Sequence, residues 1–173
     1  MPSPRNIREL ETLLASSERD NGLNHVDTVE ARHKLAHGHR AMHHFDKAII
    51  LFKENISTSE KSLGPTHRTT LRRRSSLANC LYAAGRYKEA IQTFKSILSD
   101  RLRSLGPYHP DTLRTQGSLA NCYRAIGDLE KSLRLHGENL RLRKRILGVQ
   151  DLSTIASAKN VHFTKHLINT SDQ

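Results

Sequence analysis

The chain has 173 residues, and its 28 lysines and arginines against 17 aspartates and glutamates give a formal net charge of +11. Only 36% of the residues are hydrophobic, tryptophan is absent and two cysteines occur. This composition excludes a disulfide scaffold and leaves too little apolar material for the thick core of a large α/β enzyme. No apolar run approaches the length of about 18 residues that a membrane span needs. No apolar segment follows the first residues, so we expect no secretory signal and a cytoplasmic location.

The first predicted element is a helix over residues 4–21, with Leu10, Leu13 and Leu14 on one stripe. It stops before a glycine that recurs every 42 residues, at Gly22, Gly64, Gly106 and Gly148. The segments after these glycines also repeat, as in Leu-Gly-Pro-Thr-His (63–67) and Leu-Gly-Pro-Tyr-His (105–109). A fixed period of this length indicates a repeat architecture.

Each repeat reads as two helices. The first helix has a good N-cap residue at its predicted start, namely Asp27, Thr69, Asp111 or Ser153. It ends at Gly85 and Gly127 in two of the repeats, and at His43, a weaker stop, in another. The second helix shows an apolar stripe at steps of three and four, made in one repeat by Tyr87, Ala90, Ile91, Phe94, Ile97, Leu98, Leu102 and Leu105.

A helix pair cannot bury its apolar stripe alone, so neighbouring pairs must stack. We therefore predict an all-α fold, a right-handed superhelical solenoid of antiparallel helix pairs that uses residues 1–173 as one array. Its parts are a lone second-type helix at 4–21, three complete repeats at 25–66, 67–108 and 109–150, and a lone first-type helix at 151–168 that caps the array.

These motifs resemble the tetratricopeptide repeat, specifically its 42-residue kinesin-light-chain-like variety. The resemblance is carried by Leu-Gly-Pro-Tyr-His-Pro-Asp-Thr-Leu (105–113), Leu-Ala-Asn (119–121) and Gly-Arg-Tyr-Lys-Glu-Ala (85–90). It implies the superhelical repeat fold and a role in protein–protein recognition, without naming a partner.

In that family the first helix of each pair lines a concave groove that binds peptide segments. By position in the repeat, the resemblance assigns a peptide-binding set that comprises His37, Arg40, Arg72, Ser75, Asn79, Tyr82, Arg114, Asn121, Arg124 and Phe163. Asparagine amides can hold the peptide bonds of a ligand, and arginines can bind its carboxylates. The expected ligand is therefore an extended, acidic peptide. His37 departs from the asparagine pattern of the other repeats.

Two other functions remain open for this basic chain. Nucleic acid could bind a basic face shared by Arg134, Arg141 and Arg145, with Arg101, Arg103, Arg143 and Lys144 nearby, although few aromatic residues are available for stacking. The chain could also be a pure oligomerisation module, because each lone terminal helix leaves an apolar stripe open to a homodimer partner.

The sequence shows no catalytic motif, so we expect neither an enzyme nor a cofactor. The histidine pairs His33/His37 and His39/His43 have metal-ligand spacing on a helix, but nothing in the sequence completes a site. The histidines of the turn motif, His25, His67 and His109, are expected to have structural roles. Cys80 and Cys122 occupy equivalent repeat positions and are expected to be small packing residues.

Overall fold

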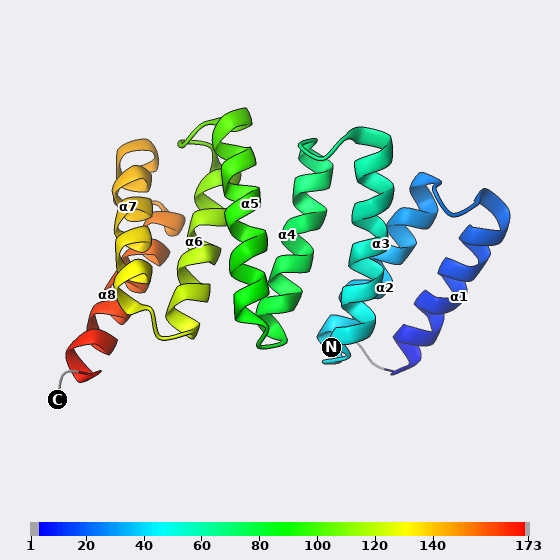
Figure 1. Cartoon of the computed structure of the whole chain (residues 1–173), viewed down its shortest axis with the longest axis horizontal. Helices are drawn as coiled ribbons and strands as arrows, with labels where there is room; N and C mark the ends of the chain where they lie inside the picture. The colour runs from blue at the N-terminus through cyan, green and yellow to red at the C-terminus, as the bar shows by residue number, and fades with distance from the viewer. Residues whose placement is uncertain (1–3, 172–173) are drawn as a thin grey trace. The chain divides into compact units, whose positions relative to one another are not determined.

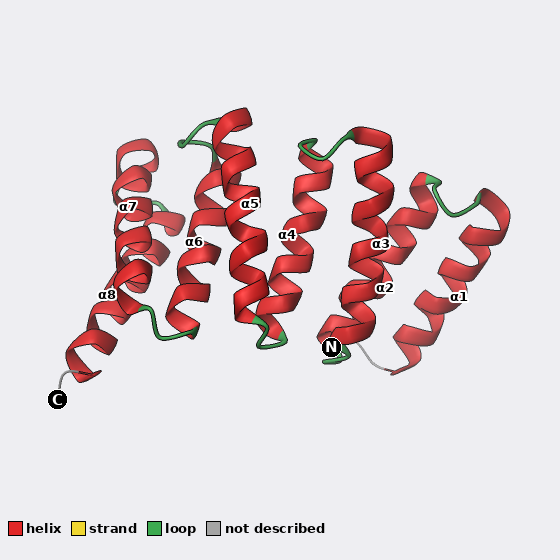
Figure 2. Cartoon of the chain, viewed as in Figure 1, coloured by secondary structure: helices red, strands yellow, loops and turns green. Residues whose placement is uncertain are grey.

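In a computed structural model, residues 4–171 are described, and they form helices joined by short turns (Figure 2). The described residues contain eight helices and no strand: α1 (Pro4–Asn21), α2 (Val26–Ala41), α3 (Phe45–Leu63), α4 (Arg68–Ala83), α5 (Tyr87–Leu105), α6 (Pro110–Ala125), α7 (Leu129–Leu147) and α8 (Leu152–Ser171). We call α2, α4, α6 and α8 the A-type helices and α1, α3, α5 and α7 the B-type helices. No helix in the described range is long and apolar enough to cross a membrane.

The chain divides into two compact units, unit 1 up to Arg86 and unit 2 from Tyr87 onwards. In unit 1, α1 packs against α2, α2 against α3, and α3 against α4; α5 to α8 pack in the same succession in unit 2 (Figure 1). The core lies between the helices of each unit. In unit 1 it includes Ile7 and Leu14 of α1 against Ala31 and Leu35 of α2.

The A-type helices begin one or two residues earlier than predicted. In α2, α4 and α6 the N-cap is the histidine of the turn motif, whose Nδ1 accepts the backbone N–H two residues on, as in His109 and Asp111 (3.1 Å). Asp151 plays the same part before α8, where its Oδ1 accepts the N–H of Ser153 at 2.8 Å. The prediction of Asp27, Thr69, Asp111 and Ser153 as N-caps was therefore wrong, because an imidazole nitrogen accepts this hydrogen bond as a carboxylate does.

The turns after α2, α4 and α6 each contain a residue with positive φ. Gly85 and Gly127 have φ of +75° and +82° after α4 and α6, and His43 adopts φ of +59° at the equivalent place after α2. Buried Thr28 and Thr70 fix the preceding turns, because each hydroxyl donates to the carbonyl of the repeat glycine at 2.8 Å. This hydrogen bond therefore fixes the turns before α2 and α4, whereas the equivalent hydroxyls of Thr112 and Thr154 are buried without a hydrogen-bond partner among the described residues.

Replacing Gly106 by valine should lower the free energy of unfolding by about 1–3 kcal/mol, because φ is +78° there and a β-branched residue resists that conformation. No atom lies within 4 Å of a Cβ at this position, so the cost comes from the backbone. Urea unfolding measures it. Gly137→Ala, in an open helical position of α7, is the control and should stabilise slightly. A parent-like midpoint for Gly106→Val would contradict the assignment.

Arginines, as well as apolar residues, hold B-type helices to the A-type helices that follow. Arg101 of α5 is 5% exposed and donates to the Asp111 carbonyl at 2.9 Å and to Thr115 of α6. In unit 1 the arginine lies on the A-type helix instead, since Arg73 of α4 donates to the hydroxyl of Ser59 on the B-type helix α3. Leu102, predicted on the buried stripe of α5, is 44% exposed instead, because the arginine takes the inward position.

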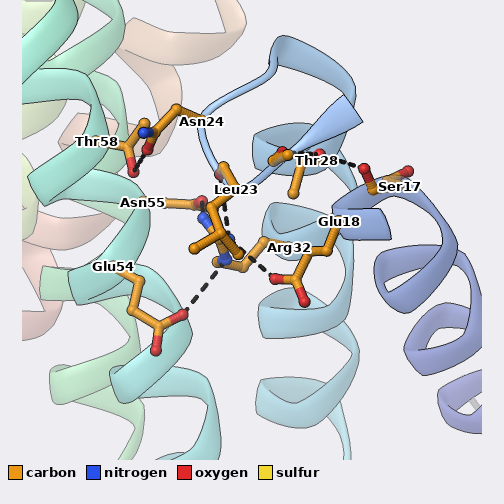
Figure 3. Close-up of polar contacts among 10 residues, drawn as sticks. Ser17, Glu18, Leu23, Asn24, Thr28, Arg32, Glu54, Asn55 and Thr58 are labelled. Atoms are coloured by element: carbon orange, nitrogen blue, oxygen red, sulfur yellow. Dashed lines mark hydrogen bonds and ion pairs between the residues drawn. The ribbon is translucent and has the colours of Figure 1, made fainter. Parts of the chain in front are cut away.

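A second buried arginine joins three helices of unit 1 (Figure 3). The guanidinium of Arg32 on α2 donates to Glu18 of α1 at 3.1 Å and lies 3.3 Å from Glu54 of α3. It also donates to the Leu23 carbonyl and to Asn55 Oδ1. The two carboxylates compensate the charge that α2 buries.

Candidate functional site

The predicted peptide-binding residues lie on A-type helices of both units. In unit 1 they are His37 and Arg40 on α2, with Arg72, Ser75, Asn79 and Tyr82 on α4; in unit 2 they are Arg114, Asn121 and Arg124 on α6, with Phe163 on α8. We call these two sets the unit 1 surface and the unit 2 surface.

A histidine pair occupies the α2 side of the unit 1 surface. His37 Nε2 lies 3.2 Å from His33 Nε2, and the ring of His37 packs edge-on against buried Phe52 of α3, with centroids 5.1 Å apart. Burial, together with the smaller effects of the neighbouring His33 and Arg40, lowers the pKa of His37 to about 4. Burial also lowers the pKa of His33. Both imidazoles are therefore neutral at pH 7 and can hydrogen-bond a ligand without adding charge.

Positive charge reaches this pair from α4 as well as from α2. Arg72 and Arg73 both lower the pKa of His33, while Glu30 raises it. Arg40 lowers the pKa of His37. Three guanidinium groups thus act on one pair of neutral imidazoles, with Glu30 as the opposing carboxylate. Sequence reasoning missed Arg73, because its anchoring to Ser59 depends on how α3 packs against α4.

On α4, Asn79 is exposed, while Ser75 and Tyr82 are partly buried. The Ser75 hydroxyl is used within the helix, because it donates to the Leu71 carbonyl at 2.9 Å. Asn79 lies one turn further along the same helix. Its amide offers a donor and an acceptor to a ligand backbone.

Three predicted residues meet in the unit 2 surface. Arg124 donates to Asn121 Oδ1 at 2.9 Å, and its guanidinium carbon lies 5.0 Å from the centre of the Phe163 ring of α8. The amide and the ring hold this guanidinium in place, which reduces the entropy lost when it binds a carboxylate. Arg114 does not join them: it pairs with Asp111 on its own helix.

His136 of α7 is a buried residue near this surface that the sequence analysis missed. It is 1% exposed, and its Nε2 has no hydrogen-bond partner among the described residues. Burial, together with the smaller effect of Arg124, lowers the pKa of His136 to about 4. Phe52 and Phe94 occupy the equivalent repeat positions. The histidine in place of this phenylalanine in the third repeat was the sequence signal that could have identified the residue.

The histidine pairs and cysteines singled out in the sequence form neither a metal site nor a disulfide among the described residues. His39 pairs with His44 through Nδ1 atoms 3.4 Å apart, and the His43 ring packs on Phe45 instead. Among residues 4–171 no three His, Cys, Asp or Glu side chains gather as metal ligands. Both cysteines are free and buried, and burial raises the pKa of Cys122 to about 12.

Two of the basic residues expected near the possible nucleic-acid face are drawn into the protein, whereas the face itself stays exposed. Arg101 is buried against α6, and the Nε atom of Arg143 is buried as well. The arginines Arg134, Arg141 and Arg145 remain exposed on α7. Arg145 lies over the ring of Tyr108, with 5.8 Å to the centroid.

The fold and these surfaces define a class of all-α proteins built from stacked antiparallel helix pairs. A family model described as tetratricopeptide repeat matches residues 27–100 and, overlapping them, residues 75–145. The chain therefore belongs to the tetratricopeptide repeat family.

Solved structures with kinesin-light-chain-type repeats have a similar fold. A Podosopora anserina putative kinesin light chain with nearly identical TPR-like repeats matches with a TM-score of 0.82 and 21% identity, over 96% of this chain and 79% of that one. BtubC from P. vanneervenii matches with a TM-score of 0.74 and 17% identity, over 94% of this chain and 65% of that one. No curated protein matched the sequence.

Proposed function

We propose that this protein is a non-catalytic scaffold that binds an extended acidic peptide segment of a partner along the faces of its A-type helices. Tetratricopeptide repeats generally mediate protein–protein interaction, which gives the class of function. The acidic character of the ligand is the finer part of the proposal. It is supported by the groups that the two surfaces present.

The observation that carries the proposal is the held guanidinium of the unit 2 surface. Arg124 lies between an amide oxygen of Asn121 and the ring of Phe163, on two neighbouring A-type helices. Its Nη1 atom is buried without a hydrogen-bond partner among the described residues, so a ligand carboxylate would accept from its other N–H groups, and half-exposed Phe163 offers an apolar contact next to it. This combination suits an acidic residue followed by an apolar one.

The unit 1 surface supports the same ligand in a different way. Exposed Asn79 can both donate to and accept from a peptide bond, whatever the side chains of the ligand. Arg40 and Arg72 provide positive charge beside the neutral pair His33/His37. Backbone contacts in this unit would therefore hold the ligand, and electrostatic attraction would favour a negatively charged one.

Reversing charge in Arg72→Glu/Arg124→Glu should weaken binding of a fluorescein-labelled 12-residue peptide rich in Asp, Glu and Ser by about tenfold or more. Fluorescence anisotropy at 50 and 500 mM salt measures this. Parent binding should be tighter at low salt, because screening weakens exposed charge pairs. The reversed variant should lose most of that dependence.

Lys53→Glu/Lys88→Glu is the matched control, because it changes the net charge of the chain equally but at exposed positions of the B-type helices α3 and α5. The affinity of this control variant for the peptide should stay within about threefold of the parent affinity. A lysine-rich peptide and a random 12-nucleotide DNA serve as competing probes. Equal parent affinity for both peptides, or tighter binding of the DNA, would overturn the proposal.

A further inference from the structure

We propose that copies of this chain bind end to end, with α1 of one copy packing on α8 of the next as a B-type helix packs on the A-type helix of its own repeat. This contact is separate from the peptide-binding surfaces and does not depend on the proposed function.

The repeat register identifies both helices as halves of a pair. The B-type helices α1 and α3 end at Asn21 and Leu63, and the A-type helices α6 and α8 begin at Pro110 and Leu152, each 42 residues apart. Inside the units, α2 packs on α3 and α6 packs on α7. In residues 4–171 no A-type helix precedes α1 and no B-type helix follows α8.

The exposure of equivalent residues shows which faces are left open. On the A-type side, Val29 and Leu113 are each 3% exposed, whereas Ile155 of α8 is 36% exposed. On the B-type side, Asn55 and Asn139 are 0% and 2% exposed, whereas Leu13 of α1 is 44% exposed. The positions that meet within a repeat are therefore the ones that α8 and α1 present to solvent.

A hollow of about 380 Å³ marks this place on α8; its lining residues are Lys144, Val149, Thr154, Ile155, Ala158, Lys159 and His162. Another hollow lies at the equivalent place in the first repeat, where Glu18, Leu23 and Arg32 correspond to Lys144, Val149 and Ala158. There α3 supplies the facing wall through Glu54, Ser57 and Thr58. Within the described residues no second helix forms that wall at the hollow on α8, so the hollow is open to a B-type helix.

The side chains at these positions match one another in the first and third repeats, and those of α8 and α1 match in an apolar way, which supports α1 as the occupant. In the first repeat Arg32 meets Glu54 and Asn55 of α3 (Figure 3). In the third repeat Gln116 accepts from Asn139 of α7 and donates to its Glu138, both at 3.2 Å.

At the proposed contact the equivalent residues are Ala158 on α8 and the pair Thr12 and Leu13 on α1. Ala158 stands where α2 and α6 have the polar Arg32 and Gln116. Thr12 and Leu13 stand where α3 and α7 have a carboxylate and an amide. Ala158 and Leu13 can therefore form an apolar contact without burying an unpaired charge.

One residue on α8 works against close packing. Ala36 and Ala120 are 0% exposed at the position where α8 has His162. The imidazole holds the incoming helix away from α8 at that end, so His162→Ala should strengthen the association by several fold. A variant that gains affinity cannot be explained by loss of folding.

Because the two faces differ, the contact is heterologous, and each copy carries one of each. Sedimentation velocity of the 173-residue chain from about 5 to 200 μM should show a mass that rises past the dimer. Leu13→Asp and Ile155→Asp should each be monomeric, because either variant buries a carboxylate in every contact it could form. Ile50→Asp, at a 57% exposed position of α3, should behave like the parent.

Mixing the two monomeric variants decides the arrangement. Leu13→Asp keeps an intact α8 and Ile155→Asp keeps an intact α1, so an equimolar mixture should form a dimer and stop there. Persistence of a dimer in Leu13→Asp alone would indicate an α8–α8 contact and overturn the proposal. A parent that remains monomeric across the whole concentration range would overturn it as well.

Discussion

His136→Phe should raise the free energy of unfolding, and the gain should be larger at pH 5 than at pH 7.5 by about 2 kcal/mol. The folded protein holds the pKa of His136 at about 4, against an ordinary value of 6.5. Between these values the unfolded chain binds the extra proton, so the stability that the neutral ring provides is present above pH 6.5 and is lost as the pH falls toward 4. Phenylalanine removes this proton uptake.

At pH 7.5 the same substitution should still stabilise by about 1–2 kcal/mol, because it removes a buried Nε2 without a partner. Phe52 and Phe94 show that the repeat accepts the ring at this position. Urea unfolding at both pH values measures the two gains. Leu140→Phe, on the same helix α7, removes no titratable group, so it is the control and its effect should be equal at both pH values. An equal gain for His136→Phe at the two pH values would contradict a neutral buried imidazole.

The double variant Asn79→Ala/Asn121→Ala should weaken binding of the acidic peptide by about 2–4 kcal/mol, which is a loss of affinity of roughly 30- to 1000-fold. Each substitution leaves a ligand peptide group without its hydrogen-bond partner. Loss of Asn121 also removes the hydrogen bond that orients the Arg124 guanidinium beside the Phe163 ring. Fluorescence anisotropy measures the affinity, and far-UV circular dichroism should stay unchanged.

Gln92→Ala on α5 is the matched control, since it removes an exposed amide from a B-type helix. It should bind the peptide like the parent. Asn79→Asp/Asn121→Asp keeps the side-chain shape but replaces donors by negative charge, and it should bind the acidic peptide more weakly than the alanine variant. Affinity within twofold of the parent for the alanine variant would place the binding surface elsewhere.

The sequence by itself determined the class of fold and the register of its helices. The glycines at 42-residue intervals have positive φ where the B-type helices end, and the predicted stripe of α5 is buried at Ala90, Ile91, Phe94 and Ile97, although not at Leu102. These features depend on local chemistry, namely the left-handed turn and the period of 3.6 residues, which a sequence shows directly. The peptide-binding residues could be assigned by register in the same way, and their role stays a prediction.

Tertiary structure decided which polar residues are buried and with what they pair. Sequence periodicity could not tell that Arg101 turns inward while Leu102 faces solvent, because the choice depends on Thr115 and the Asp111 carbonyl of the next helix. It could not tell that Arg124 packs on Phe163 rather than standing free. Long polar side chains can reach several neighbours at little cost in their own helix, so the packing of the adjacent helix determines the partner.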